Sequence, residues 1–342
     1  MVEMANEAKG ELPLVTFALF AYNQEKYIRE AVEGALAQDY PNLEIIISDD
    51  CSQDETVAQA ELAIAGYKGP HRVEVRTTKT NLGPFRHVLD VAKFARGQLL
   101  VLAAGDDISK PARVSRLATA WLTEGAWGLS SRYDTIDADG NGIESNLRTE
   151  ELFSPDFNLR HYFKDRDDIG IVHGATSAYS MELFRSVHAT DVPWILSEDG
   201  TFSLLINLMN KKIMHLDESL INYRAHDDAL TNFSTVAPGK DALYSFIKKA
   251  ALYALSSRNR AEYFLAFAMA NNSVVGREIN QEFVRRDILR QDLRAKWAQM
   301  SFAQRFVRSL ALPGDWKWTV PRIFGVSAYV TMKLLRDRLH SL

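Results

Sequence analysis

The chain has very little cysteine, with Cys51 the only one among 342 residues. A single thiol excludes an intrachain disulfide framework and a zinc site built from several thiolates. The fold must therefore draw its stability from a buried core, for which a hydrophobic content of 46% is ordinary. These features favour a reducing, cytoplasmic setting.

Long apolar runs and the common phosphate-loop motifs are also missing. No stretch approaches the roughly 20 apolar residues that cross a bilayer, and residues 1–11 are polar, without the apolar region of a secretory signal. Neither G-x-x-x-x-G-K-[ST] nor G-x-G-x-x-G occurs. A P-loop ATPase and a dinucleotide oxidoreductase are therefore disfavoured.

A net positive charge is confined to the C-terminal end, and the rest of the chain is net acidic. From residue 296 on, eight basic residues stand against two acidic ones, whereas the whole chain has a net charge of -4. An acidic body with a basic tail argues against a nucleic-acid partner. In the tail, aromatic residues such as Trp316 and Trp318 alternate with the basic ones. This pattern is typical of a helix on an anionic membrane surface, and packing of its apolar side on the protein is the alternative.

Apolar runs alternate with amphipathic segments through the first third of the chain. The pattern predicts strands at 14–20, 43–47, 73–77 and 99–104, and helices at 24–38, 55–65, 84–95 and 111–123. Such alternation predicts an α/β fold with a mostly parallel, Rossmann-like sheet covered by helices on both faces. A helix at 199–209 and a strand at 212–223 follow, and only helical periodicity continues from about 237. We expect a tail at 1–11, an α/β domain at 12–232 and a C-terminal helical extension at 233–342.

Three acidic pairs carry the functional signal. Asp49-Asp50 and Asp106-Asp107 each follow a predicted buried strand, and Glu198-Asp199 opens a predicted helix. Because ligands bind at the carboxyl ends of the strands in an open parallel sheet, the first two pairs should point into one crevice. Adjacent carboxylates repel unless a cation or a donor meets them. Mg²⁺ or Mn²⁺ bound to a substrate diphosphate suits such oxygen ligands.

In combination, these motifs resemble the family 2 glycosyltransferases, which have the GT-A fold, over roughly residues 12 to 230. The residues that carry the resemblance are Ala21-Tyr22-Asn23, the segment from Gln38 to Ile45, the segment from Ser48 to Thr56, Asn81-Leu82-Gly83, Gly105-Asp106-Asp107 and Ser197-Glu198-Asp199. Their order and spacing both match the family.

The resemblance implies a role for each matching position. Tyr22 would lie near the nucleotide base, and Asp50 would accept a hydrogen bond from an imide N–H of that base. Asp106 would hold the ribose hydroxyls or the metal, and Asp107 would ligate the metal on the diphosphate. Because the motif is Gly105-Asp106-Asp107 and not Asp-x-Asp, it leaves open which carboxylate is the ligand. Asp199 would be the general base that deprotonates the acceptor hydroxyl.

Other residues at matching positions have two interpretations. Glu198 would tune Asp199 or bind the acceptor. His173 and Ser177 lie in the segment that the resemblance places on the acceptor side, or they satisfy backbone groups in a buried turn. His226 would reach the diphosphate or the metal, or it is a surface histidine. Cys51 stands where the family often has glycine, and a tolerated small residue is favoured over a nucleophile.

The resemblance implies an inverting, metal-dependent glycosyltransferase that uses Mn²⁺ or Mg²⁺. A UDP-sugar is the favoured donor, a glycan or polyprenyl-diphosphate-linked hydroxyl the acceptor, and a surface polysaccharide such as O-antigen or capsule the product. The enzyme would be cytoplasmic, attached by its tail to the inner face of the cytoplasmic membrane. One alternative is a nucleotidyltransferase of similar fold, but Phe20-Ala21-Tyr22-Asn23 supplies no basic phosphate loop. The other is a non-catalytic nucleotide-sugar or glycan-binding module, which needs no acceptor-side base such as Asp199.

Overall fold

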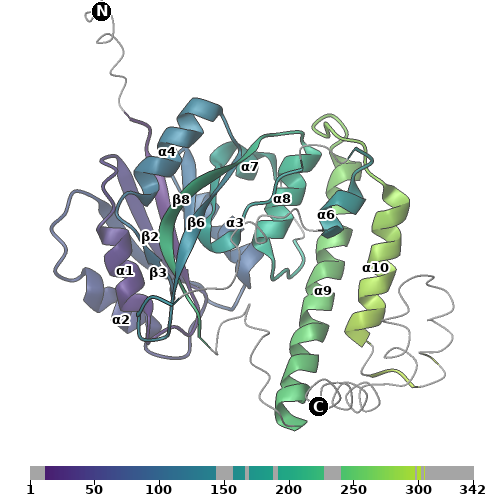
Figure 1. Ribbon diagram of the computed structural model, residues 1–342, viewed down its shortest axis with the longest axis horizontal. Coiled ribbons are helices and arrows are strands. Elements are labelled where there is room, and N and C mark those ends of the chain that lie inside the picture. Colours follow the sequence, from purple (N-terminus) through teal and green to yellow (C-terminus); the bar gives the residue numbers. More distant parts are fainter. Residues whose placement is uncertain are drawn as a thin grey trace, which may run out of the picture. The chain divides into compact units, whose positions relative to one another are not determined.

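The computed structural model describes residues 12–143, 157–165, 169–187, 192–226, 240–296, 299–301 and 304, with only the backbone at 157–158 and 240–250. The chain divides into two compact units, Met1–Asn232 with Ala266–Asn280, and Phe233–Leu265 with Gln281–Leu342 (Figure 1). The boundary predicted near residue 232 falls within 227–239, outside the described residues, and stays a prediction. The same holds for the predicted tails, because residues 1–11 and 305–342 also lie outside them.

Within its described residues, the first unit contains one sheet of eight strands in the order β3-β2-β1-β4-β7-β6-β8-β5. The strands are β1 (Val15–Ala21), β2 (Leu43–Asp49), β3 (Arg72–Thr77), β4 (Leu99–Ala104), β5 (Ile108–Ser109), β6 (Gly128–Ile136), β7 (Ala178–Ser180) and β8 (Ile213–Arg224). Strands β3, β2, β1 and β4 run parallel to one another, as do β6 and β8. Strand β7 joins these two groups and is antiparallel to both β4 and β6, and β5 is antiparallel to β8. The predicted mostly parallel α/β sheet is confirmed.

Helices cover both faces of this sheet. They are α1 (Ile28–Leu36), α2 (Thr56–Ile64), α3 (Pro84–Phe94), α4 (Arg113–Glu124), α6 (Phe157–Tyr162), α7 (Met181–Ser186) and α8 (Glu198–Leu208), with a 3₁₀ turn η1 (Gly174–Thr176). On one face, α1 and α4 pack on the sheet. On the other, α3, α7 and α8 meet through Phe85, Phe184 and Phe202, with ring centroids 5.1 Å apart for Phe85 and Phe202 and 5.3 Å apart for Phe184 and Phe202.

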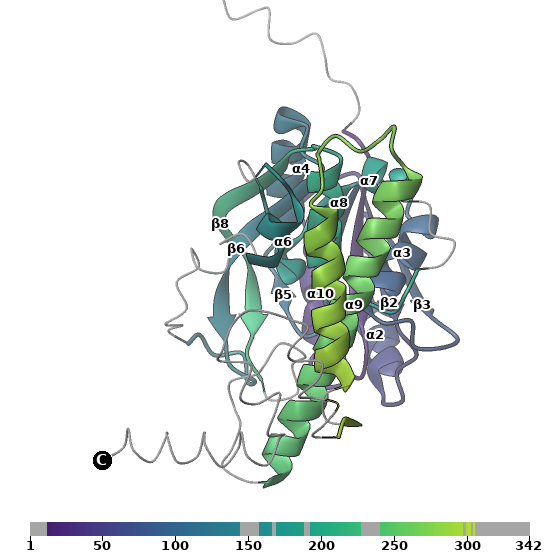
Figure 2. The ribbon, with the colours of Figure 1, turned by 90° about the vertical axis from the view of Figure 1, so that its right-hand side faces the viewer.

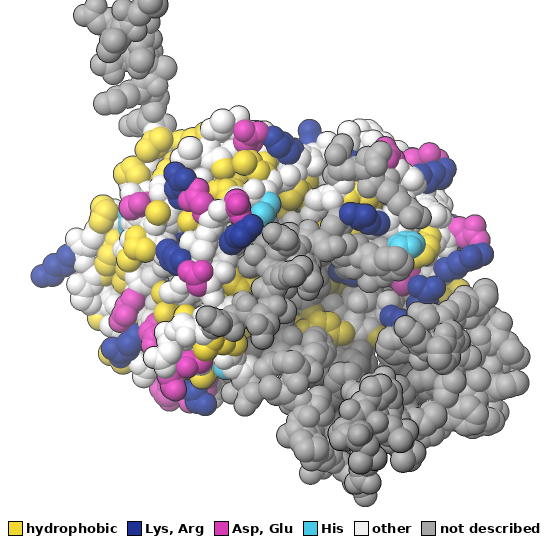
Figure 3. Space-filling view, in the orientation of Figure 1, with side chains coloured by type: hydrophobic (Ala, Val, Ile, Leu, Met, Phe, Trp, Pro, Cys, Tyr) yellow, Lys and Arg dark blue, Asp and Glu magenta, His cyan; other side chains and the backbone are white. Residues whose placement is uncertain are grey.

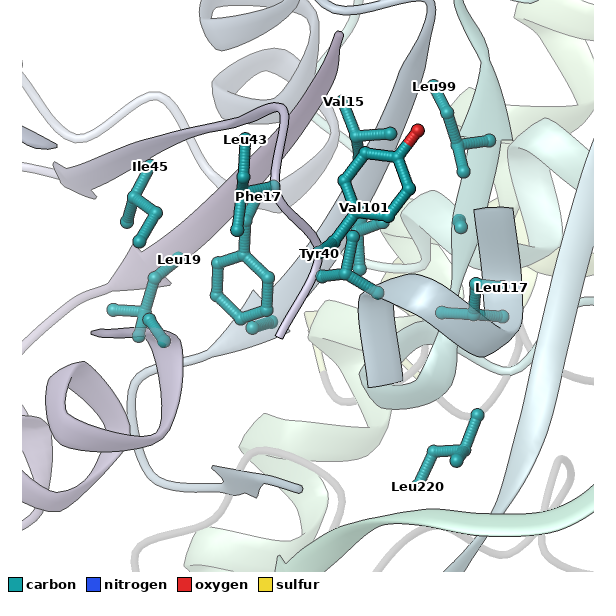
Figure 4. Packing of buried hydrophobic residues seen from close by; sticks show 14 of the residues in the cluster. Val15, Phe17, Leu19, Tyr40, Leu43, Ile45, Leu99, Val101, Leu117 and Leu220 are labelled. Atoms are coloured by element: carbon teal, nitrogen blue, oxygen red, sulfur yellow. The ribbon is translucent and has the colours of Figure 1, made fainter. Parts of the chain in front are cut away.

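The core on the α1 and α4 side is built from side chains at matching positions of neighbouring strands. Phe17 on β1 is in register with Ile45 on β2 and Val101 on β4, so all three point to the same face. These three residues and Leu117 of α4 are fully buried, and Figure 4 shows them in one cluster. Burial on both faces of the sheet explains why the β2 segment from Leu43 to Ile47 is apolar at every position except Glu44.

The first of the predicted helices begins later than the sequence suggested. The prediction was 24–38, but α1 spans Ile28–Leu36. The amide of Gln24 donates to Thr56 Oγ1 at 2.7 Å, and the amide of Glu25 donates to Asp54 Oδ2 at 3.2 Å. Because these side-chain acceptors hold the backbone in a turn, the regular helix starts one turn further on.

The second unit contains α10 (Gln281–Lys296) and most of α9 (Lys240–Ala270), which lie side by side in Figures 1 and 2. Arg258 of α9 lies 3.5 Å from Asp292 of α10. The predicted helical extension is therefore present in the described part. Among the described helices, none combines the length and the apolar character that crossing a membrane requires.

Glu44 is a buried carboxylate, 4% exposed, that ties together the ends of three strands. It accepts hydrogen bonds from Thr16 Oγ1, from the amide of Arg96 and from Arg96 Nε, each at 2.7 Å. Burial alone raises the pKa of Glu44, but the hydrogen bonds from Thr16 and Arg96 outweigh burial and hold the pKa below its ordinary value. The resulting stability is present above the unfolded-state pKa and is lost as pH falls through the folded-state pKa.

We expect Glu44→Gln to lower the free energy of unfolding at pH 7 by about 1–3 kcal/mol, because it weakens charge-assisted bonds in a buried site. The loss should shrink as the pH falls through the folded-state pKa, since the wild-type carboxylate is then protonated too. Urea unfolding at a series of pH values measures the difference in the free energy of unfolding between the variant and the wild type. The control is Glu61→Gln at an exposed position of α2, and a pH-independent cost at Glu44 would contradict the assignment.

Cys51 has a left-handed backbone conformation, with φ of 66°. It lies in the turn after β2, where its Cβ makes this conformation unfavourable and a glycine would adopt it without strain. Cys51→Gly should therefore raise the free energy of unfolding by about 0.5–1 kcal/mol. Cys51→Ala keeps a Cβ and serves as the matched control in chemical unfolding. A glycine variant no more stable than the alanine variant would contradict the strain at this position, and an alanine variant less stable than the wild type would show that the thiol contributes to the turn.

Candidate functional site

The acidic pairs after β2 and β4 lie at one edge of the sheet. Strand β1 runs between β2 and β4, and the register pairs Ala21 with Asp49 and Phe20 with Ala104. The chain stays in contact beyond the strands, because the Asp50 amide donates to Ala21 O and the Gly105 amide to Phe20 O, each at 2.9 Å. Tyr22, 45% exposed, follows β1 at the same edge. The segments that carry the first two pairs thus lie together at the carboxyl ends of β1, β2 and β4, and a crevice at this edge stays a prediction.

The two carboxylates of the first pair are held by different loops. Asp49 is 2% exposed and accepts from the Ser52 amide at 2.8 Å and from Thr77 Oγ1 at 3.0 Å, which makes it a cap of the turn after β2. Asp50 accepts from Thr78 Oγ1 at 3.1 Å and from the amides of Leu82 and Gly83, each at 2.8 Å. Asp50 therefore fixes the loop before α3 next to the predicted base-binding edge. It is 4% exposed.

The second pair is only partly satisfied by the protein. Asp107, 6% exposed, accepts from the Arg224 amide through Oδ1 at 2.8 Å. Its Oδ2 is buried and has no hydrogen-bond partner among the described residues. Burial and then the charge of Asp106 raise the pKa of Asp107 well above its usual range, against the Arg224 amide and the guanidinium groups of Arg113 and Arg224. Asp106 Oδ2 lies 3.1 Å from His226 Nε2.

These residues fit a divalent cation that takes most of its ligands from elsewhere. No group of three or more His, Cys, Asp or Glu side chains in the described part could hold a metal alone. A buried carboxylate oxygen without a partner is nevertheless costly until a cation or a donor meets it. The unpartnered Oδ2 of Asp107, beside Asp106 and His226, is a hard ligand of the kind that Mg²⁺ and Mn²⁺ share with phosphate and water.

The third pair begins α8. Asp199 accepts from Ser197 Oγ at 2.8 Å and from the Gly200 amide at 2.6 Å through Oδ1, and from the Gly174 amide at 3.1 Å through Oδ2. Burial, and then the charge of Asp199, raise the pKa of Glu198 to about 8. A Cβ on Gly174 would lie 2.8 Å from Glu198 Oε1, so a side chain at this position would displace the pair.

Three aromatic rings connect the second pair to the third. His173 stacks on Tyr133 of β6 with centroids 5.6 Å apart, and Tyr133 lies 5.1 Å from Tyr223 of β8. Burial raises the pKa of Tyr133 to about 12, with additional contributions from Tyr223 and Asp107. Burial also lowers the pKa of His173, against the charge of Asp199. The three rings therefore lie in a row formed by Tyr223 of β8, Tyr133 of β6 and His173, the residue before η1.

Ser177 differs from the other predicted acceptor-side residues because it is fully buried. Its amide donates to Gly174 O at 3.1 Å, and its carbonyl accepts from the Leu102 amide at 3.0 Å. These backbone bonds tie the turn to β4, whereas the Ser177 hydroxyl is buried and has no hydrogen-bond partner among the described residues. A direct contact between Ser177 and an acceptor stays a prediction.

Sequence reasoning missed two buried arginines beside the second pair. Arg224 is 2% exposed, and its Nε donates to Asp106 O at 3.0 Å and its Nη1 to Ala138 O at 2.9 Å. Its Nη2 contacts Glu30 of α1 at 2.5 Å. Arg113, at the start of α4, is 1% exposed. An isolated arginine gives no sequence signal for burial, because arginine usually lies at the surface, where acidic and basic side chains are interspersed on the face in Figure 3.

Comparisons with known proteins support one family. The 30% identity to the succinoglycan biosynthesis protein ExoO of Rhizobium meliloti extends over 152 residues, which are 44% of this chain and only 42% of that protein. An uncharacterised glycosyltransferase of Haemophilus influenzae is 34% identical over 229 residues, covering 63% of this chain and 66% of that protein. A mannosyltransferase structure from Pyrobaculum calidifontis, in complex with GDP-Man and Mn²⁺, has a TM-score of 0.49 and 15% identity, covering 94% of this chain and 80% of that one.

The family model described as "Glycosyl transferase family 2" matches residues 16–187. The match includes the strands that carry the first two acidic pairs and the turn that contains Gly174, whereas Asp199 and His226 lie beyond it. It covers half of the 342 residues. The chain therefore belongs to glycosyl transferase family 2.

Proposed function

We propose that the protein transfers a sugar, with inversion, from a nucleotide-diphosphate sugar to a hydroxyl group of a glycan or a polyprenyl-diphosphate-linked acceptor. The favoured donor is a UDP-sugar, and the reaction depends on Mn²⁺ or Mg²⁺. The observation that carries the proposal is that Asp107 has a buried oxygen without a partner among the described residues, and that the Gly174 amide holds a second carboxylate, Asp199.

The nucleotide would bind at the ends of β1 and β2. Tyr22 is exposed there and offers a ring to the base, and Asp50 offers carboxylate lone pairs to an imide N–H. Because each oxygen of Asp50 already accepts from the loop at Thr78–Gly83, its orientation is fixed before the donor arrives. Because the Asp50 carboxylate is already held in place, binding of the base costs little free energy for ordering this side chain, which supports the role.

The diphosphate would lie against the second pair. Asp107 and His226 would hold the metal, and Asp106 would hold the ribose hydroxyls or share the metal. A bound divalent cation supplies positive charge that stabilises the departing nucleoside diphosphate. The protein's own contribution is to keep Asp107 in place through the Arg224 amide and to keep His226 beside Asp106.

The acceptor would approach Asp199. Its hydroxyl proton passes to the Asp199 carboxylate while the hydroxyl oxygen bonds to the anomeric carbon of the donor sugar. The bond from that carbon to the diphosphate oxygen breaks, and its electron pair leaves with the nucleoside diphosphate. Displacement from the opposite face inverts the anomeric centre. Glu198 and His173 flank this position, and we assign both, with Ser177, to the acceptor side.

A role in surface polysaccharide assembly, such as O-antigen or capsule synthesis, is supported by the relative named for succinoglycan biosynthesis. The matched region spans less than half of that relative, so the product is part of the proposal. We also propose a cytoplasmic location, with the basic tail attached to anionic lipid near the acceptor.

The proposal is tested with Asp107→Asn and Asp199→Asn and a panel of UDP-, GDP- and dTDP-sugars, with and without Mn²⁺. We expect one nucleotide to raise the melting temperature of the wild type only when Mn²⁺ is present. Asp107→Asn should lose this effect, because the amide is a poor metal ligand. Asp199→Asn should keep it but lose about 10²- to 10⁴-fold in kcat, because the base is gone.

The exposed variant Glu61→Gln is the control for both measurements. The wild type failing to respond to every nucleotide sugar would reject the proposed donor class. Full turnover in Asp199→Asn would reject the base assignment while leaving the donor assignment intact.

Gly174 provides an independent test of the acceptor side. In Gly174→Ala the new methyl group would meet Glu198 Oε1 at 2.8 Å and Asp199 Oδ2 at 3.4 Å, so the pair must move. We expect a fall in kcat of about tenfold or more with donor binding unchanged. Gly66→Ala, whose Cβ would have no neighbour within 4 Å, is the matched control. Equal kcat values in the two variants would mean that the acceptor does not use this loop.

A further inference from the structure

Arg113 lies between the two halves of the proposed site and is buried. Its Nη1 donates to Ser109 Oγ at 2.8 Å, and its Nη2 donates to Leu102 O at 2.5 Å and to Ala175 O at 3.0 Å. These acceptors belong to β5, to β4 and to the turn η1, and the turn is far from the two strands in the sequence. A planar guanidinium that donates to several fixed acceptors holds them at a defined separation.

The charge of Arg113 is balanced by the metal-side carboxylate. Two of the three acceptors are neutral carbonyl groups and the third is a neutral hydroxyl. Burial lowers the pKa of Arg113 to about 10, and the negative charge of Asp107 opposes that effect. The same guanidinium acts against the rise in the pKa of Asp107. A buried cation needs such a partner, so Arg113 and Asp107 stabilise each other electrostatically, although these two described residues form no direct hydrogen bond.

The carbonyl of Ala175 extends this link to the acceptor side. Ala175 follows Gly174, whose amide donates to Asp199 Oδ2. The turn is also tied to β4 by the bond from the Leu102 amide to Ser177 O. The Arg113 guanidinium therefore joins the β4 and β5 segments on either side of Asp107 to the turn whose Gly174 amide binds Asp199.

We propose that Arg113 is a positioning residue that holds the Gly174–Thr176 turn, and through it Asp199, in a fixed place relative to Asp107. This inference rests on the proposed function. In an inverting transfer the base and the leaving diphosphate must lie on opposite sides of the sugar, so the separation of the two carboxylates limits the rate. Arg113 touches neither the donor nor the acceptor.

Arg113→Lys is the sharpest test because it keeps the charge beside Asp107 and removes the planar fork. An ammonium group on a flexible stem cannot donate to Ser109, Leu102 and Ala175 in the same geometry. We expect faster amide hydrogen exchange in peptides covering residues 171–180, with unchanged exchange in β1. The value of kcat should fall about tenfold or more, whereas the Mn²⁺-dependent thermal shift produced by the nucleotide should be retained.

Arg96→Lys is the matched control, because Arg96 also pairs with a buried carboxylate, Glu44, but lies away from the site. It should lower the melting temperature without changing exchange in 171–180 or kcat. Unchanged exchange in the turn of Arg113→Lys, or faster exchange with wild-type kcat, would overturn the inference. Absence of nucleotide binding and transfer in the wild type would instead reject the proposed function, while the exchange measurement would still report whether Arg113 holds the turn.

Ser109→Ala guards against a failure of Arg113→Lys to fold. It removes only the hydroxyl that accepts from Nη1 and leaves the guanidinium in place. The inference requires amide exchange in the peptides covering residues 171–180 to be faster than in the wild type, by less than in Arg113→Lys. A turn as protected as in the wild type would overturn the inference.

Discussion

The carboxyl group of Asp107 is buried, and among the described residues only one of its oxygens accepts a hydrogen bond. The Arg224 amide binds that oxygen, and the guanidinium groups of Arg113 and Arg224 act on the group electrostatically. Arg113 and Arg224 also link the end of β4, the end of β8, the start of α4 and the turn η1 in this region. Their positions are coupled, because moving any of them would leave either a carboxylate or a guanidinium buried without a partner.

Buried carboxylates in this protein fall into two groups that their hydrogen bonds distinguish. Glu44 and Asp49 accept bonds on both oxygens from neighbouring residues, and their role is to hold strands and turns together. Asp107 instead keeps one oxygen free of hydrogen bonds among the described residues. A buried polar atom without a hydrogen-bond partner lowers the stability of the fold. Such an atom is therefore expected where a ligand supplies the missing partner. The same residue types thus have different functions because of their surroundings.

Much of the fold could be predicted because its signals are local. The apolar run at Leu43–Ile47 and the alternation of strands and helices follow from burial on both faces of a parallel sheet. The start of α1 was predicted too early, since acceptors from Asp54 and Thr56, about 30 residues away, hold its first turn. The antiparallel strand β7 was also beyond prediction, because three residues carry too little periodicity to identify a strand.

The sequence determined the residue types and their order: acidic pairs after buried strands and an acidic pair at a helix start. Its single cysteine also excluded a disulfide framework and a zinc site built from several thiolates. Those properties depend on neighbours in the chain, which a sequence displays directly. Only the tertiary structure decided that Asp49 is a cap, that Asp107 has an oxygen without a partner among the described residues, and that Arg113 joins β4 to the Gly174–Thr176 turn. Burial and hydrogen bonding between distant segments depend on how the layers pack, and no local pattern encodes that packing.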